Sequence, residues 1–187
     1  DPRVIYLKGN HEDLLVNALN NYPKKSNLSL WFQNGGESTY KAFCDDNDME
    51  KLKIIKQLKE LPFCTSYINN KGTFIFLCHA GCDGDDIDFL DEYRAIWDRS
   101  HFIIADTWYG DDNTIVIHGH TPIELMLSEQ KFTKKRCSKE IELPDYTDGA
   151  YWYAKGHKVC IDMGTPWKNK ALLLNLDTFA EVIFINE

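Results

Sequence analysis

The sequence lacks several features that would assign it to a class at once. It has no apolar run near the roughly eighteen residues that a transmembrane helix needs, and its first residues do not resemble a secretory signal. Its 6 cysteines include no Cys-x-x-Cys pair, so a zinc ribbon is not supported. Internal repeats and low-complexity segments are absent too. What is present is an ordinary globular composition: 187 residues, 43% of them hydrophobic, are enough for one domain with a substantial core.

The chain also lacks an excess of positive charge. Its net charge of -8 argues against a general nucleic-acid binder, which would normally show a basic face. One local exception, "KFTKKRCSK" at 131–139, is interpreted as a solvated loop, with a docking surface for an acidic or phosphorylated partner as the alternative. A chain of this size needs no disulfide framework, and several cysteines lie in apolar segments. We therefore expect reduced thiols, a cytoplasmic protein, and neither a nucleic-acid nor a membrane partner.

The distribution of apolar residues predicts an α+β fold in a single domain over 1–187. The front of the chain predicts a short buried strand, an amphipathic helix with Leu14, Leu15 and Ala18 on one face, a polar loop, and a second helix that Pro62 ends. The "NNKG" segment predicts a hairpin turn, and a charged helical segment and further short strands follow. The strands in the C-terminal part of the chain are expected to be mostly antiparallel. The expected ranges are strands at 4–7, 64–68, 73–78, 114–117, 158–162, 171–176 and 181–185, helices at 10–19, 47–61 and 88–101, and a polar loop at 20–39.

Three of the expected strands run into polar clusters that carry histidine: "GNHE" after 4–7, "HAG" after 73–78 and "HGHT" after 114–117. One such histidine is more often structural than a ligand. Three in similar settings, each beside a small residue that lets the backbone approach closely, favour a shared site at one edge of a sheet. Neutral imidazole is the commonest metal ligand, and an asparagine can add a carbonyl oxygen. Mixed nitrogen and oxygen ligands suit Mn, Fe, Zn or Co better than Ca.

The first cluster has a plainer interpretation. Asn10 could be only the N-cap of the helix that follows, with Glu12 in the first turn complementing the helix dipole. Taken alone, the cluster does not decide between the cap and a ligand.

The ordered set "GNHE", "HAG" and "HGHT", together with "NGG", "IWDR" and a late "IDMG", resembles the metal-dependent phosphoprotein phosphatases of the calcineurin-like metallophosphoesterase superfamily. The bacterial and phage branch is more similar, because it carries "GHT" in the last cluster. The resemblance covers nearly the whole chain. It implies a layered α/β sandwich that hydrolyses phosphoserine and phosphothreonine in proteins, or small phosphoesters, at two divalent transition ions, most plausibly Mn, with Fe or Zn as alternatives.

The resemblance also implies a role for particular residues. Asn10, His79 and His120 match the protein ligands of one ion, and His11 matches the histidine that protonates the departing oxygen. Arg99 of "IWDR" matches an arginine that grips the substrate phosphate, with Arg94 as the weaker choice. By the same comparison Glu12 has a structural role that supports the site, and His118 either supports the site or is structural. His101 and His157 lie outside these motifs and are expected to be structural.

The family also has two upstream motifs, "GDxHG" and "GDxxDRG", that hold the first ion, and neither occurs in these 187 residues. We therefore expect that the N-terminal part of the catalytic domain is missing, that one metal site is incomplete, and that this chain alone is inactive. Two alternatives to a phosphoprotein phosphatase stay open. One is a dinucleoside polyphosphate hydrolase, in which the aromatic residues of 146–153 would stack on a base, and the other is a non-catalytic binding module with a degenerate site. Loops at 20–39 and 125–154 would set the specificity.

Overall fold

The structure is a computed structural model of the chain, and it describes residues 1, 3–19, 25–45, 47–103, 107–137, 146 and 148–185, without the side chains at 25, 26, 45 and 137. Contacts along the chain divide it into two units, Asp1–Phe63 and Cys64–Glu187, and each unit is described by itself. The expectation of one domain over 1–187 stays a prediction. In the described part of the chain, no helix combines the length and the apolar character that crossing a bilayer requires.

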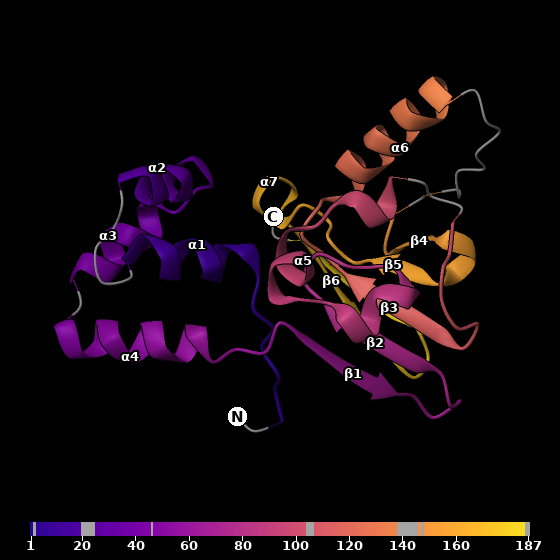
Figure 1. The fold of residues 1–187 in the computed structure, drawn as a ribbon, viewed down its shortest axis with the longest axis horizontal. Coiled ribbons are helices and arrows are strands. Elements are labelled where there is room, and N and C mark those ends of the chain that lie inside the picture. Colours follow the sequence, from indigo (N-terminus) through magenta and orange to yellow (C-terminus); the bar gives the residue numbers. More distant parts are fainter. Residues whose placement is uncertain are drawn as a thin grey trace. The chain divides into compact units, whose positions relative to one another are not determined.

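The first unit is helical in its described residues (Figure 1), and its helices are α1 (Asn10–Leu19), α2 (Lys25–Gln33), α3 (Glu37–Asp45) and α4 (Asp48–Lys59). The apolar face predicted for α1 is confirmed, because Leu14, Leu15 and Ala18 are buried. The predicted start of α4 is confirmed as well, since the side chain of Asn47 accepts a hydrogen bond from the backbone N–H of Glu50 at 3.0 Å.

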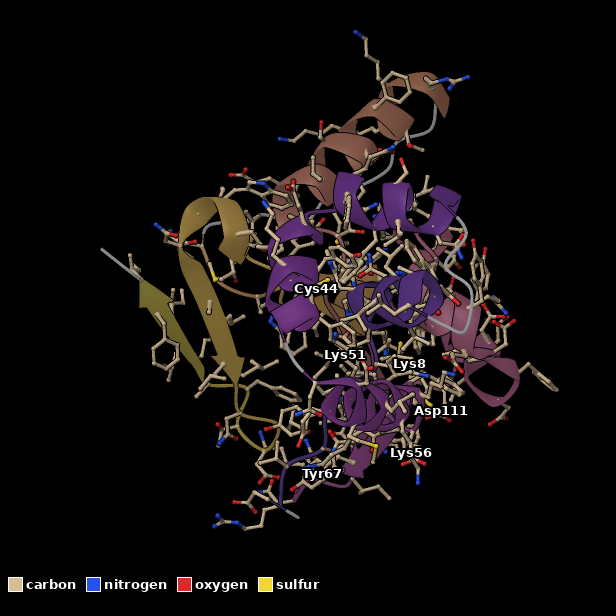
Figure 2. All side chains as sticks on the ribbon, turned by 90° about the vertical axis from the view of Figure 1, so that its left-hand side faces the viewer. Lys8, Cys44, Lys51, Lys56, Tyr67 and Asp111 are labelled. Atoms are coloured by element: carbon tan, nitrogen blue, oxygen red, sulfur yellow. The ribbon has the colours of Figure 1, made fainter. Side chains whose placement is uncertain are left out.

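The segment before α1 differs from the prediction. Val4, Ile5 and Tyr6 are exposed, and residues 4–9 form no strand, so the expected buried strand at 4–7 is wrong. An apolar run becomes a strand only when a neighbour completes its hydrogen-bond ladder, and none of the described strands pairs with this segment. The segment is held at its end instead. There Lys8 donates from its backbone N–H to the carbonyl of Pro62 at 2.8 Å and from Nζ to the carbonyl of Lys59 at 3.1 Å (Figure 2).

The polar loop predicted at 20–39 is wrong over its described part, which contains α2 and the start of α3. Trp31 on α2 is buried, and the turn that follows lies against its indole. A Cβ at Gly36 would come within 2.3 Å of Trp31 Nε1, so this glycine is required for the turn to pack on the ring. Gly35 and Gly36 therefore belong to a tight connection between α2 and α3 rather than to a substrate loop.

The second unit is built on a five-stranded sheet in the order β1-β2-β3-β5-β4 (Figure 1). Its strands are β1 (Cys64–Ile68), β2 (Phe74–Cys78), β3 (Thr114–His118), β4 (Tyr151–Tyr153) and β5 (Lys158–Cys160). The predicted hairpin is confirmed by the antiparallel β1–β2 pair. The central pairs β2–β3 and β3–β5 are parallel, so this sheet is mixed. The antiparallel character expected for the C-terminal strands is confirmed for β4–β5 and for the separate pair β6–β7 (residues 170–174 and 181–185), but not for β3–β5. The fold is α+β, as predicted.

The two faces of this sheet are covered by different elements. On one face, Ile75, Ile117 and Val159 pack with apolar residues at the end of a two-stranded sheet formed by β6 (Lys170–Leu174) and β7 (Glu181–Ile185). On the other face, Tyr151, Tyr153 and Cys160 form a core with residues from α6 (Ile123–Cys137) and from the short helix η2 (Ser100–Phe102). The mixed sheet therefore lies between a helical layer and a β-hairpin.

Three segments of the second unit differ from the prediction. The specificity loop expected at 125–154 is largely α6 and β4 where it is described, so residues 131–137 of the basic cluster lie on a helix rather than in a loop, and Lys139 falls outside the described residues. The helix expected at 88–101 is broken into η1 (Gly84–Phe89), α5 (Glu92–Trp97) and η2. Two further short helices, η3 (Ala154–Gly156) and α7 (Thr165–Lys168), were not predicted. The cysteines with described side chains are free thiols: Cys44, Cys64, Cys78, Cys82 and Cys160.

Candidate metal and phosphate site

Two of the three histidine clusters meet at one edge of the mixed sheet. His79 directly follows β2, and His120 lies just beyond the end of β3. Because β2 and β3 are neighbours and run parallel, their carboxyl ends lie at the same edge. Nε2 of His79 is 3.2 Å from Nδ1 of His120, and the two ring centroids are 5.0 Å apart. The sequence prediction that these two histidines converge therefore agrees with the structure of the second unit.

The loops that carry this pair are joined through their backbones. The N–H of Gly119 donates to the carbonyl of His79 at 2.9 Å, and the N–H of Thr121 donates to the carbonyl of Gly119 at 2.7 Å. His120, between them, has a φ of 66°, in the left-handed region that costs a residue with a side chain about 1–2 kcal/mol. Backbone strain of this kind persists where the surroundings hold it, and it clusters at functional sites.

A network of buried polar side chains contacts the segments that carry His79 and His120. Nε2 of His101 is 2.7 Å from the carbonyl of Ala80, and its Nδ1 is 3.1 Å from the hydroxyl of Tyr153. The same hydroxyl is 2.8 Å from Nε2 of His118. A carbonyl can only accept, so His101 donates from Nε2 and accepts at Nδ1 from the hydroxyl of Tyr153. Nδ1 of His118 lies 3.2 Å from the carbonyl of Gly119, so the single N–H of a neutral His118 serves either that carbonyl or the hydroxyl oxygen of Tyr153. One tyrosine thus connects the loop of His79 to the strand that leads to His120.

The network is neutral because it is buried. Burial lowers the pKa of His101 to about 3 and holds the pKa of His118 well below its ordinary value, and burial raises the pKa of Tyr153. Gly81 makes room for both imidazoles, since a Cβ there would lie 2.5 Å from the ring of His101 and 2.9 Å from that of His118. The glycine of "HAG" is therefore a packing requirement of the network.

The same face buries a charged lysine, which the sequence reasoning missed. Lys158 on β5 is 0% exposed, forms an ion pair with Asp83, and donates from Nζ to the carbonyl of His101 at 2.8 Å. Burial lowers the pKa of Lys158 and raises that of Asp83, in opposition to their mutual attraction. The segment "KVCID" did not indicate that its lysine is buried, because a lysine side chain usually keeps its charged end in water.

Arg99 lies beside the paired histidines through a side-chain hydrogen bond. Its Nε donates to Oγ1 of Thr121, the residue after His120, at 3.2 Å, while the residue as a whole is exposed. Arg94, the weaker choice from the sequence, is held elsewhere by an ion pair with Asp86, from Nη2 to Oδ2 at 2.5 Å. Of the two arginines, Arg99 is therefore the one hydrogen-bonded next to the histidine pair, and its role in phosphate binding stays a prediction.

Asn10 and His11 belong to the first unit, at the start of α1. The carbonyl of Gly9 accepts the first helical hydrogen bond, from Asp13 at 3.2 Å, and the N–H of Gly9 donates to Oε2 of Glu12 at 2.8 Å. Gly9 therefore occupies the N-cap position and Glu12 closes half of a capping box, so the helix does not need Asn10 as its cap. Asn10 is only 7% exposed, whereas His11 is exposed. Their expected convergence with His79 and His120 stays a prediction.

One carboxylate near the pair was not singled out from the sequence. Asp162 of "IDMG" follows β5, and a Cβ at Gly119 would lie 3.7 Å from the Cβ of Asp162. Its Oδ1 accepts from the N–H of Gly164 at 2.9 Å, and burial raises its pKa. The signal was present, because "IDMG" is a third strand end at the same edge of the sheet and carries a carboxylate.

The histidine pair fits a metal ion, although a complete ligand set is not assembled. Zinc-type bonds of about 2.0–2.1 Å place two nitrogens of one tetrahedral ion roughly 3.4 Å apart, close to the observed 3.2 Å. Within the described residues, no three His, Cys, Asp or Glu side chains gather around one point. The second unit thus offers two nitrogen ligands, and further ligands would have to come from an asparagine, from water or from other residues.

Comparison with known proteins adds no relative to this description. No protein-family model matches the chain, and no curated protein matches it at a significant level. The function is therefore inferred from the residues and their geometry.

Proposed function

We propose that the protein hydrolyses phosphate monoesters, with phosphoserine and phosphothreonine in proteins as the leading substrates, in the manner of the metal-dependent phosphoprotein phosphatases. The observation that carries the proposal is the approach of His79 Nε2 to His120 Nδ1, 3.2 Å apart, at the carboxyl edge of two adjacent parallel strands. The mixed sheet between a helical layer and a β-hairpin is compatible with the calcineurin-like metallophosphoesterase sandwich, which we propose as the fold family.

In this proposal His79, His120 and Asn10 hold one of two divalent transition ions, most plausibly Mn. When bound, such ions would supply Lewis-acid activation of water and of the phosphoryl group. The buried network of His101, Tyr153 and His118 holds both histidine loops in place and, being neutral, adds no positive charge next to the ion. The absence of a carboxylate among the three proposed ligands implies weak binding by this chain.

Arg99 binds the substrate phosphate in this scheme. Thr121 uses Nε of the guanidinium and fixes its plane, so the two terminal amino groups are the donors left to form a bidentate contact with phosphate oxygens. His11, exposed at the start of α1, gives a proton to the departing alkoxide. Each residue therefore has a distinct part: the histidine pair and Asn10 bind the ion, Arg99 orients the substrate, and His11 moves a proton.

The dinucleoside polyphosphate hydrolase stays an alternative, in which aromatic residues of 146–153 would stack on a base. Tyr151 and Tyr153 are buried in the core and stacked on each other at 5.4 Å, so that role would fall to the partly buried Tyr146 and Trp152. The non-catalytic binding module makes different predictions about the metal and about His11, and the following experiment separates it from the phosphatase.

The test measures metal binding and catalysis separately. Co²⁺ titrated into the 187-residue chain should give the visible absorption of a histidine-bound ion, and His79→Ala and His120→Ala should each weaken binding by about tenfold or more. In a chain to which upstream residues carrying "GDxHG" and "GDxxDRG" have been added, phosphate release from a phosphoserine peptide with Mn²⁺ should be slowed by roughly 10²–10⁴-fold in His11→Asn, the usual range for loss of a general acid. That variant should still bind Co²⁺ as the wild type does.

His157→Ala is the matched control, because His157 lies at the opposite, amino ends of β3 and β5, where its Nδ1 contacts the carbonyl of Thr114. Metal binding without phosphate release, even with upstream residues supplying "GDxHG" and "GDxxDRG" restored, would favour the binding module. Cobalt binding that survives His79→Ala and His120→Ala would refute the proposed site.

A further inference from the structure

A cavity in the second unit begins next to the residue that anchors Arg99. It has a volume of about 310 Å³, and Pro122, which follows Thr121, forms part of its lining. Other apolar walls come from Leu125 on α6, from Met163 and from Trp167 on α7. A volume of this size lies at the low end of ligand pockets and suits one large side chain rather than an extended molecule.

Apolar surface at this cavity is unusually open to solvent. Trp167 is 75% exposed, although an indole is among the side chains most favoured at binding interfaces. Leu125, which also lines the cavity, is exposed as well, whereas Met163 is buried. An aromatic ring bound in the cavity would cover apolar surface of Trp167 and Leu125.

The charged residues that line the cavity are already paired with one another. Lys168 forms an ion pair with Glu124, and Lys170 forms one with Asp148, from Nζ to Oδ2 at 2.8 Å. Both of these lysines are therefore engaged with carboxylates rather than available to bind the phosphates of a polyphosphate. The polar edge of a nucleobase would also compete with these ion pairs for hydrogen bonds, whereas an apolar side chain leaves them intact.

We propose that this cavity, defined by Pro122, Leu125, Met163 and Trp167, binds an aromatic side chain of a protein substrate, one or two positions from the phosphorylated residue. The proposal rests on the proposed function for its place in catalysis, because Arg99 and the cavity are joined through the adjacent residues Thr121 and Pro122. An extended peptide advances by about 3.3–3.6 Å per residue, so the residues on either side of the phosphoresidue stay close to the phosphate. The site would select peptides with phenylalanine, tyrosine or tryptophan beside the phosphate.

The first arm of the test measures binding and needs no catalysis. Two unphosphorylated serine peptides that differ only in Phe or Ala beside the serine are titrated against the full 187-residue chain by calorimetry. The Phe peptide should bind about tenfold or more tightly than the Ala peptide, and Trp167→Ala should abolish that ratio. Phe132→Ala is the matched control, since Phe132 is 59% exposed on α6 and does not line the cavity. A second variant, Leu125→Gln, should reduce the ratio as well.

The outcomes are distinct. Equal binding of the two peptides, or a ratio that survives both Trp167→Ala and Leu125→Gln, overturns the aromatic site. Displacement of the Phe peptide by diadenosine tetraphosphate would show that the cavity takes a base and would also overturn it. A second arm compares kcat/KM for the phosphorylated pair in a chain to which the two upstream motifs have been added. A Phe preference in binding without any phosphate release from that extended chain would reject the proposed function while supporting the cavity. If both phosphopeptides release phosphate with equal kcat/KM and the two unphosphorylated peptides bind equally, the aromatic site is rejected and the proposed function is supported.

Discussion

Acidification should destabilise the second unit through His101, which is buried as a neutral ring between the carbonyl of Ala80 and the hydroxyl of Tyr153. Its folded-state pKa is about 3, whereas an unperturbed histidine titrates near 6.5. Between these two values the unfolded chain binds a proton that the folded chain does not. The contribution of His101 to stability is therefore complete above pH 6.5 and is lost as the pH falls toward 3.

The size of this loss follows from the two pKa values. From pH 7 to pH 5 a single group with these values loses about 2 kcal/mol of stability, at 1.36 kcal/mol per pKa unit. Asp83 and Asp162, whose pKa values are raised by burial, change stability in the opposite direction over an overlapping range. The contribution of His101 is therefore best isolated as a difference between two proteins measured under identical conditions.

The variant His101→Gln removes the titrating ring and keeps an uncharged N–H donor. Urea unfolding followed by tryptophan fluorescence at pH 7, 6 and 5 gives the free energy of unfolding of each protein. The stability advantage of the wild type over His101→Gln should shrink by about 2 kcal/mol between pH 7 and pH 5. His11→Gln, at an exposed position, is the control and should follow the wild type. If His101→Gln loses stability as steeply as the wild type, His101 is not held as a buried neutral group.

Two further substitutions test the site. Tyr153→Phe should cost roughly 1–3 kcal/mol in urea unfolding and more than Tyr151→Phe, because the hydroxyl of Tyr153 serves two buried imidazoles whereas that of Tyr151 serves only Gln130. Equal losses in the two variants would contradict the network. In a catalytically competent chain, Arg99→Ala should raise KM and lower kcat, and Arg99→Lys should restore only part of the rate because an ammonium cannot form the bidentate contact. Unchanged steady-state kinetics in Arg99→Ala would remove Arg99 from the phosphate site.

The parts of the fold that depend on local signals were predictable. The hairpin of β1 and β2 was marked by alternating apolar residues and a turn sequence, and the start of α4 by an asparagine cap. The two strand ends that carry His79 and His120 were predicted for the same reason, since a short apolar run that stops at a glycine-flanked histidine is a local pattern. Their convergence followed once the strands were taken as neighbours.

The remainder depended on partners that the local sequence does not specify. The run at 4–7 has strand-forming residues, but none of the described strands pairs with it. A strand predicted from composition alone was therefore wrong. The direction of β3 and β5 was missed because parallel pairing is set by crossover connections rather than by the strands themselves. The burial of Lys158 could not be foreseen, because it depends on Asp83 and on the carbonyl of His101, both distant along the chain.

The register of the sheet has a consequence for how this protein can change. Leu77 is paired with Ile117, so β2 and β3 end level with each other and deliver His79 and His120 to one point. A single residue inserted within β3 would turn His118 toward the hairpin face and move His120 out of step with its partner. An insertion that displaces His101 would disturb the same edge of the sheet, because its Nε2 is bonded to the carbonyl of Ala80. We infer that the strand lengths in this unit, and the position of His101 in the connection between β2 and β3, are under strict constraint.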